Sequence, residues 1–317
     1  MIQRRGWSII IILILTLFIL TSCKGGASED PQDTAAALKA VQSGTQGVEA
    51  RPIANFPPAL LYDEQELNLI VEVFNRGSHD VEPQDCFVQI SGFDPNIIQG
   101  GLNVPRSCGD NLGTLEGKNI YNTKGSFNQL EFQSSTINLP LGVNEYSPTL
   151  IFDTCYRYHT IATPTICIDP QTYNLVETQK ACRAGSVSAG GGQGGPVGVG
   201  TIGVTMVGSR AVFDISVTAH GSGVVLSPSA DIQNCAYNNW DFKEINRVAY
   251  NVQMSGASLV DCKPNDGYVR LNNGQGKVIC TFEVPNTGAY ETPLIIDLDY
   301  GYKESFRQPV KIVHSPN

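Results

Sequence analysis

Hydrophobic and polar residues alternate along several stretches of the chain, and this alternation predicts β-strands. Over residues 67–75 the apolar side chains occupy every second position, so they share one face of an extended segment. Residues 212–218, 248–254 and 294–302 show the same period, and segments rich in Gly and Asn predict turns between them. Asn272-Asn273-Gly274, between residues 268–271 and 277–284, predicts the turn of a β-hairpin. Short strands at this spacing favour β-sandwiches.

The chain also repeats itself. Residues 146–158 align without a gap with residues 290–302, and Tyr, Leu, Ile, Asp, Tyr and Tyr coincide. The segments 71–77 and 215–221 correspond too, because each leads from a strand into a glycine turn. Such self-similarity indicates two copies of one structural unit. We therefore expect an all-β protein with two tandem β-sandwich domains, residues 48–182 and 201–317, joined by a Gly-rich connector, residues 183–200.

The period of two assigns faces to the repeated strands. We expect one face to form the core, with its phenol hydroxyls bonded back to the backbone as in other sandwiches. That face carries Phe152, Thr154, Tyr156 and Tyr158 in the first copy and Ile296, Leu298, Tyr300 and Tyr302 in the second. The opposite face carries Asp153, Cys155, Asp297 and Asp299.

The first residues follow another pattern. Arg4 and Arg5 precede an apolar run over residues 7–19, and Leu20-Thr21-Ser22-Cys23 follows it. This order predicts a signal peptide over residues 1–22. It resembles the lipobox of prokaryotic lipoproteins, which implies a lipid on Cys23, a polar tether over residues 23–47 and an extracytoplasmic location on the cell membrane. The alternative is an uncleaved anchor, although a spanning helix needs about 20 apolar residues.

An even number of cysteines follows Cys23, and in an exported chain this predicts disulfides. They are Cys86, Cys108, Cys155, Cys167, Cys182, Cys235, Cys262 and Cys280. No two of them have the CxxC spacing of a zinc ribbon. Our hypothesis pairs near neighbours, namely Cys86 with Cys108, Cys167 with Cys182, and Cys262 with Cys280. Cys155 and Cys235 then remain for each other, and their bond would join the two halves.

Charge and composition exclude some classes of partner. The formal net charge is -9 and no basic cluster follows the signal, whereas a nucleic-acid partner needs a positive surface. Glycines at 190–195 loosely match a nucleotide-binding loop, but a strand rather than a helix is predicted after them. We therefore expect no nucleic acid and no cofactor.

Candidate chemistry is sparse. His79, His159, His220 and His314 lie in no hydrolase motif. Asp297 and Asp299 share one strand face, but two carboxylates are too few for calcium unless a loop adds more, such as Asp266. We expect a solvated sheet face and no metal site. Tyr237 and Trp240, beside two asparagines, could form an aromatic patch that recognises sugar or protein. The alternative places Trp240 in a core between domains.

Several phrases resemble a known group of proteins. Residues 69–77, 92–95, 155–158, 166–170 and 192–197 are similar to tandem immunoglobulin-like (CARDB-like) surface lipoproteins of small-genome archaea. This resemblance implies two immunoglobulin-like domains, a surface location and a lipid anchor, and it carries no functional residue.

We therefore expect a noncatalytic, membrane-anchored lipoprotein that acts as a surface binding or adhesion module for a protein or glycan. A self-associating structural envelope component is one alternative. An enzyme with a site in the loop over residues 100–125 is another.

Overall fold

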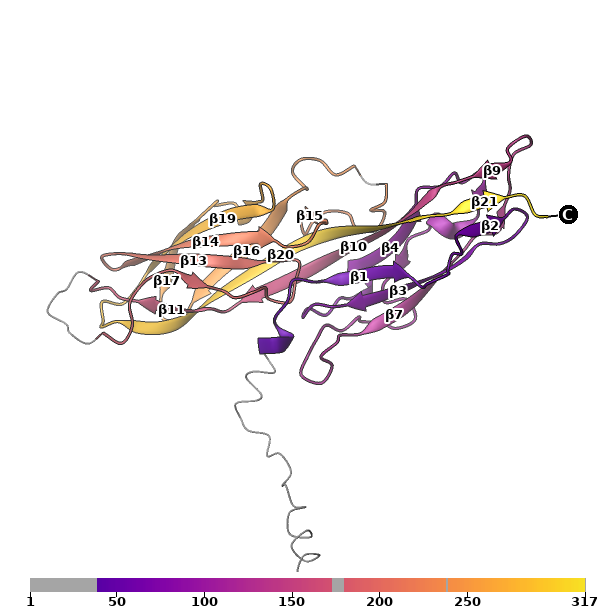
Figure 1. Cartoon of the computed structure of the whole chain (residues 1–317). Coiled ribbons are helices and arrows are strands. Elements are labelled where there is room, and N and C mark those ends of the chain that lie inside the picture. Colours follow the sequence, from indigo (N-terminus) through magenta and orange to yellow (C-terminus); the bar gives the residue numbers. More distant parts are fainter. Residues whose placement is uncertain (1–38, 173–179, 238, 317) are drawn as a thin grey trace, which may run out of the picture. The chain divides into compact units, whose positions relative to one another are not determined.

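The computed structural model describes residues 39–172, 180–237 and 239–316, and almost all of its regular structure is β-strand (Figure 1). The described residues belong to one compact unit, Leu38–Asn317. Among them, no helix is long and apolar enough to cross a membrane. The expected all-β fold is confirmed.

The elements fall into two series along the chain. The first comprises β1 (Val48–Pro52), β2 (Leu60–Tyr62), β3 (Asn68–Asn75), η1 (Pro83–Asp85), β4 (Cys86–Ser91), β5 (Ile98–Gln99), η2 (Gly101–Asn103), β6 (Arg106–Ser107), β7 (Phe127–Gln133), β8 (Thr136–Ile137), β9 (Glu145–Tyr146), β10 (Thr149–Ala162) and β11 (Thr165–Ile168). The second comprises β12 (Val187–Ser188), β13 (Val197–Val207), β14 (Arg210–Ala219), β15 (Val224–Leu226), β16 (Arg247–Met254), β17 (Ser258–Lys263), β18 (Tyr268–Arg270), β19 (Gln275–Glu283), β20 (Tyr290–Pro309) and β21 (Lys311–Val313).

A central sheet contains strands from both series. Its order is β18-β16-β20-β10-β4-β6, and β11 and β15 also pair with β20. The order is palindromic with respect to the repeat, because β6, β4 and β10 correspond to β18, β16 and β20. The other large sheets are β1-β3-β7 and β12-β13-β14-β19-β17. Side chains of all three sheets belong to one hydrophobic core.

The two repeated strands pair with each other. β10 and β20 are antiparallel along the whole of β10, and the register places Arg157 opposite Gly301. The sequence alignment makes these same two residues equivalent. Tyr156 therefore faces Tyr302, and Tyr158 faces Tyr300. Such a register is expected when two copies of one unit are related by a pseudo-twofold axis through the Arg157–Gly301 pair.

Hydrogen bonds repeat in the same way. The phenol oxygen of Tyr158 accepts from the backbone N–H of His79 at 3.2 Å, and that of Tyr302 accepts from Gly223 at 2.9 Å. A β-carbon added to Gly77 or Gly221 would lie 1.9 or 2.1 Å from these oxygens. The close approach of a buried tyrosine therefore requires glycine at both predicted turns.

The residues that the sequence assigns to the core face are indeed buried. Phe152, Thr154, Tyr156 and Tyr158 are at most 2% exposed, as are Ile296, Leu298, Tyr300 and Tyr302. The opposite face is covered in part, because Asp153 and Cys155 are also buried.

The division into two domains is not confirmed. β10 and β20 share a continuous ladder, and residues 48–182 and 201–317 lie in one compact unit. The expected connector, residues 183–200, contains β12 and the beginning of β13.

The predicted hairpin is correct for its turn but wrong for the two strands beside it. The alternation around Asn273-Gly274 predicts a hairpin, and both residues do have positive φ, 51° and 76°. However, β18 pairs with β16, whereas β19 pairs with β14 and β17. The chain therefore passes from one sheet to another at this turn.

All four predicted cysteine pairs form disulfides. Cys155–Cys235 closes the longest loop, with a sequence separation of 80. Four disulfides indicate an oxidising, extracytoplasmic environment. Cys23 and the predicted signal lie outside the described residues.

The buried phenols at the pseudo-twofold axis provide a test of this fold. Tyr300 is bonded to the Thr160 hydroxyl at 2.8 Å and to the Val197 N–H at 3.2 Å. Its counterpart, the Tyr156 hydroxyl, is buried and bonds to no described residue. Tyr300→Phe should lower the free energy of unfolding by about 1–3 kcal/mol, because it leaves bonded groups without a partner. Tyr156→Phe should be neutral or stabilising. Denaturant unfolding of the full chain with intact disulfides measures both, and equal losses would contradict the assignment.

Candidate functional site

A long segment between β15 and β16, described over residues 227–237 and 239–246, lies against the outer face of the central sheet; we call it the strap. Cys235 is joined to Cys155 of β10, and its carbonyl accepts from the Lys303 ammonium at 3.1 Å. The Arg157 guanidinium donates to the Pro228 carbonyl at 2.9 Å. The strap is therefore fixed to both repeated strands, and it explains why Cys155 is buried.

The two residues of the predicted aromatic patch have different surroundings. Trp240 is half-buried against the cluster that contains Cys155 and Cys235. Its indole N–H donates to the Asp231 carbonyl at 3.0 Å, and the Lys303 ammonium lies 5.6 Å from the centre of its ring. Tyr237 is 58% exposed. Trp240 thus packs against the strap's own disulfide, and a recognition role for the pair stays a prediction.

The carboxylates considered as calcium ligands are paired with other side chains. The His159 Nδ1 lies 2.7 Å from Asp299, and its Nε2 lies 3.7 Å from Asp297. Asp266 instead pairs with Arg247 at 2.8 Å. Among the described residues, no group of three or more His, Cys, Asp or Glu side chains could hold a metal ion.

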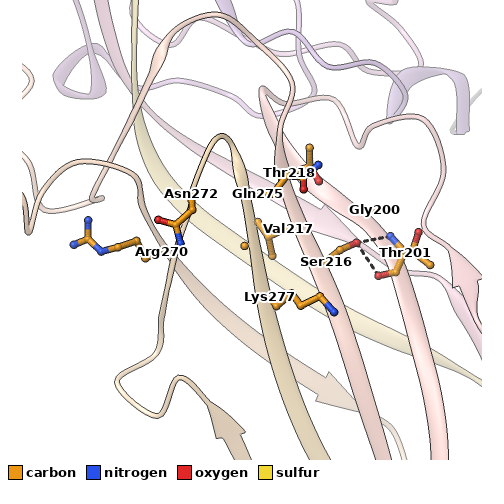
Figure 2. Close-up of a pocket in the computed structure, with 10 residues that line it drawn as sticks. Gly200, Thr201, Ser216, Val217, Thr218, Arg270, Asn272, Gln275 and Lys277 are labelled. Atoms are coloured by element: carbon orange, nitrogen blue, oxygen red, sulfur yellow. Dashed lines mark hydrogen bonds between the residues drawn. The ribbon is translucent and has the colours of Figure 1, made fainter.

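One concave surface was not predicted; we call it the polar groove (Figure 2). Its volume is about 530 Å³, within the range of ligand pockets. β13, β14, β19 and the chain that leads from β18 into the turn line it. The lining residues are Gly200, Thr201, Ser216, Val217, Thr218, Arg270, Asn272, Gln275, Gly276 and Lys277.

A β-bulge shapes one side of the groove. The register between β13 and β14 shifts between Val199 and Ile202, which leaves Gly200 and Thr201 without partners on β14, although Thr201 still pairs with Ser188 of β12. The Ser216 hydroxyl replaces that ladder, because it accepts from the Thr201 N–H at 2.6 Å and donates to the Thr201 carbonyl at 2.8 Å (Figure 2). A β-carbon on Gly200 would lie only 2.8 Å from the Ser216 oxygen. Glycine therefore keeps this side of the groove open.

Three other polar side chains that line the groove are available to a ligand. Within the described part of the chain, the Thr218 hydroxyl and the Asn272 and Gln275 side-chain amides make no hydrogen bond. They lie on well-paired backbone, since Thr218 faces Gln275 across the β14–β19 ladder. Lys277, which pairs with Asp214 at 2.7 Å, adds a cation to the lining. This set of hydroxyl, amide and ammonium groups can donate to and accept from a ligand rich in hydroxyls.

The comparisons with known proteins do not identify a relative. No family model and no curated protein matches the chain. Among solved structures, a match is the secreted serine protease VesC from Vibrio cholerae, at 10% identity and a TM-score of 0.18, covering 88% of this chain. The chain spans about half the length of that structure, 53%.

Two neighbouring histidines predict a pH dependence of stability. Burial lowers the pKa of His79, and the nearby charge of His159 lowers it further. The hydrogen bond to Asp299 raises the pKa of His159. Below pH about 6.5 the unfolded chain therefore binds a proton that folded His79 does not, so His79 makes stability fall as the pH falls.

His79→Gln should consequently reduce the loss of stability between pH 7 and pH 5. His159→Gln should make that loss steeper, because the raised pKa of His159 stabilises the fold at low pH and this contribution disappears as the pH rises through it. Urea unfolding of the full chain across this pH range measures both slopes. An unchanged slope for His79→Gln, or the same change for both variants, would refute the interpretation.

Proposed function

We propose that this protein is a noncatalytic surface module that binds glycans through the polar groove and is held outside the membrane by lipid on Cys23. The observation that carries the proposal is the set of unbonded hydroxyl and amide side chains on the rigid β14–β19 ladder. Sugars present the complementary donors and acceptors.

Rigidity favours this use of the groove. The Thr218 and Gln275 positions are fixed by backbone pairing, and the bulge at Gly200 is held by Ser216. Binding groups that already occupy their bound positions lose less conformational freedom when a ligand arrives. The groove thus needs little ordering to accept a hydroxyl-rich ligand.

The edge strands favour recognition of a ligand over self-association. β17 is the edge of its sheet, and it carries Asp261, Lys263 and a register shift between Leu259 and Asp261. The opposite edge, β12, has only two residues. Charges, bulges and short strands are features that prevent edge-to-edge pairing.

The anchor is testable apart from the groove. Cys23→Ala should abolish incorporation of labelled fatty acid, because the lipid would be carried by that sulfur, and should move the protein out of the membrane fraction. Cys155→Ala with Cys235→Ala is a matched control that removes cysteines without touching the lipobox. Fatty-acid labelling that persists in Cys23→Ala would contradict the anchor.

The groove is testable with an array of defined neutral and acidic oligosaccharides and the full chain in detergent. Thr218→Val combined with Gln275→Ala should weaken binding about tenfold, as expected when hydrogen bonds worth about 1.4 kcal/mol in total are lost. Gln253→Ala, an exposed glutamine on β16 outside the groove, should leave binding unchanged. Binding to no oligosaccharide, or equal loss in the control, would refute the proposal.

A further inference from the structure

A second concave surface adjoins the polar groove; we call it the basic pocket. Its volume is about 380 Å³, and its lining residues are Lys243, Arg247, Pro264, Asp266, Tyr268 and Arg270. Arg270 also lines the polar groove, so the two surfaces share a residue. In Figure 2 the Arg270 side chain extends away from the other labelled residues of the groove.

The charge of the basic pocket opposes that of the chain. Its lining contains three cationic side chains and one carboxylate, whereas the whole sequence has 21 Lys and Arg against 30 Asp and Glu. Asp266 binds Arg247 at 2.8 Å and offsets part of this positive charge. Lys243 makes no ion pair with any described residue. The pocket therefore keeps an excess of positive charge that an anion can neutralise.

Aromatic rings fix both guanidinium groups. Arg247 lies over the ring of Tyr268 at 3.9 Å, and Arg270 lies over the ring of Phe242 at 3.8 Å. Arg270 also donates to the Phe242 carbonyl at 2.8 Å and the Ile245 carbonyl at 3.1 Å. Arg247 bonds to Asp266 through one terminal nitrogen, so its other N–H groups remain available. A guanidinium held in this way presents planar donors that match a carboxylate.

We propose that the basic pocket binds a carboxylate carried by an acidic glycan whose neutral hydroxyls lie in the polar groove. Arg247 and Lys243 contact the carboxylate, and Arg270 lies where the two surfaces meet. This inference rests on the proposed glycan-binding function and assigns the ligand to uronate-containing chains.

The test compares oligogalacturonate with a neutral galactose oligomer of equal length, using the full chain in detergent and titration calorimetry at several salt concentrations. The acidic oligomer should bind at least tenfold more tightly, with an affinity that falls as salt rises. Arg247→Gln and Lys243→Gln should remove most of this advantage and flatten the salt dependence, and leave the neutral oligomer unaffected. Lys124→Gln, an exposed lysine outside both surfaces, should change nothing.

The outcomes separate this inference from the proposed function. Equal affinity for both oligomers, or an acidic preference that survives Arg247→Gln and Lys243→Gln, would overturn the carboxylate site and leave groove binding intact. A sulfated oligomer that binds as tightly as oligogalacturonate would overturn the choice of carboxylate. Lys243- and Arg247-dependent binding to anionic lipid vesicles, without binding to oligogalacturonate, would overturn the glycan assignment. Binding of neither oligomer, together with an empty array, would refute the proposed function as well.

Discussion

The antiparallel pairing of β10 with β20 is the interaction on which the rest of the structure depends. It joins segments from the two copies of the repeat in one ladder, and it brings Tyr156, Tyr158, Tyr300 and Tyr302 together on the core side. On the other side the same ladder carries the Cys155–Cys235 disulfide and the strap. Without this pairing each copy would have an unpaired strand edge on its longest strand, which is an aggregation hazard.

The sequence predicts those parts of the fold that depend on local patterns. Alternation identifies the strand faces, because burial on one side imposes a period of two. The cysteine pairs follow near neighbours along the chain, apart from Cys155 and Cys235. No local pattern indicates that β10 pairs with β20, because the two strands are far apart in the sequence. For the same reason the period of two, which places Asp153 on the face opposite the core, does not predict that it is buried and pairs with Lys303 at 3.1 Å.

The site was harder to predict than the fold. Tyr237 and Trp240 stood out by residue type alone, and Trp240 proves to pack on the disulfide of its own strap. The polar groove draws its residues from separate segments, each an ordinary polar stretch of a strand or a turn. Only the Asn273-Gly274 turn gave a local signal, and it indicated a hairpin rather than a change of sheet. Which polar side chains remain without a hydrogen bond depends on burial and on strand pairing, and no sequence motif indicates it.

The tyrosines show how the two copies have diverged at the axis. Thr160, which bonds to Tyr300, is equivalent in the repeat to Glu304. Burial raises the pKa of Glu304, and the neighbouring charge of Glu49 raises it further. The pKa of Tyr156 is raised by burial first and also by Glu304. The position equivalent to Thr160 thus carries a carboxylate that does not bond to Tyr156, and the Tyr156 hydroxyl bonds to no described residue.

The same comparison shows how the residues of the basic pocket differ from those at the equivalent positions of the first copy. Cys155 and Asp299 are equivalent, and their ladder partners are Phe87 and Ala249. Asp85 lies two residues before Phe87, and Arg247 lies two residues before Ala249. The charge at this position is therefore reversed between the two copies.

Tyr268, which faces Ala249, likewise corresponds to Ser107, which faces Phe87. The first copy lacks both the guanidinium and the ring that supports it, and its Asp85 instead binds Arg157, which holds the strap. The equivalent positions of the two copies, Asp85 and Arg247, therefore have different roles. The first copy uses its carboxylate to fix the strap on the shared sheet, and the second presents fixed cations to solvent.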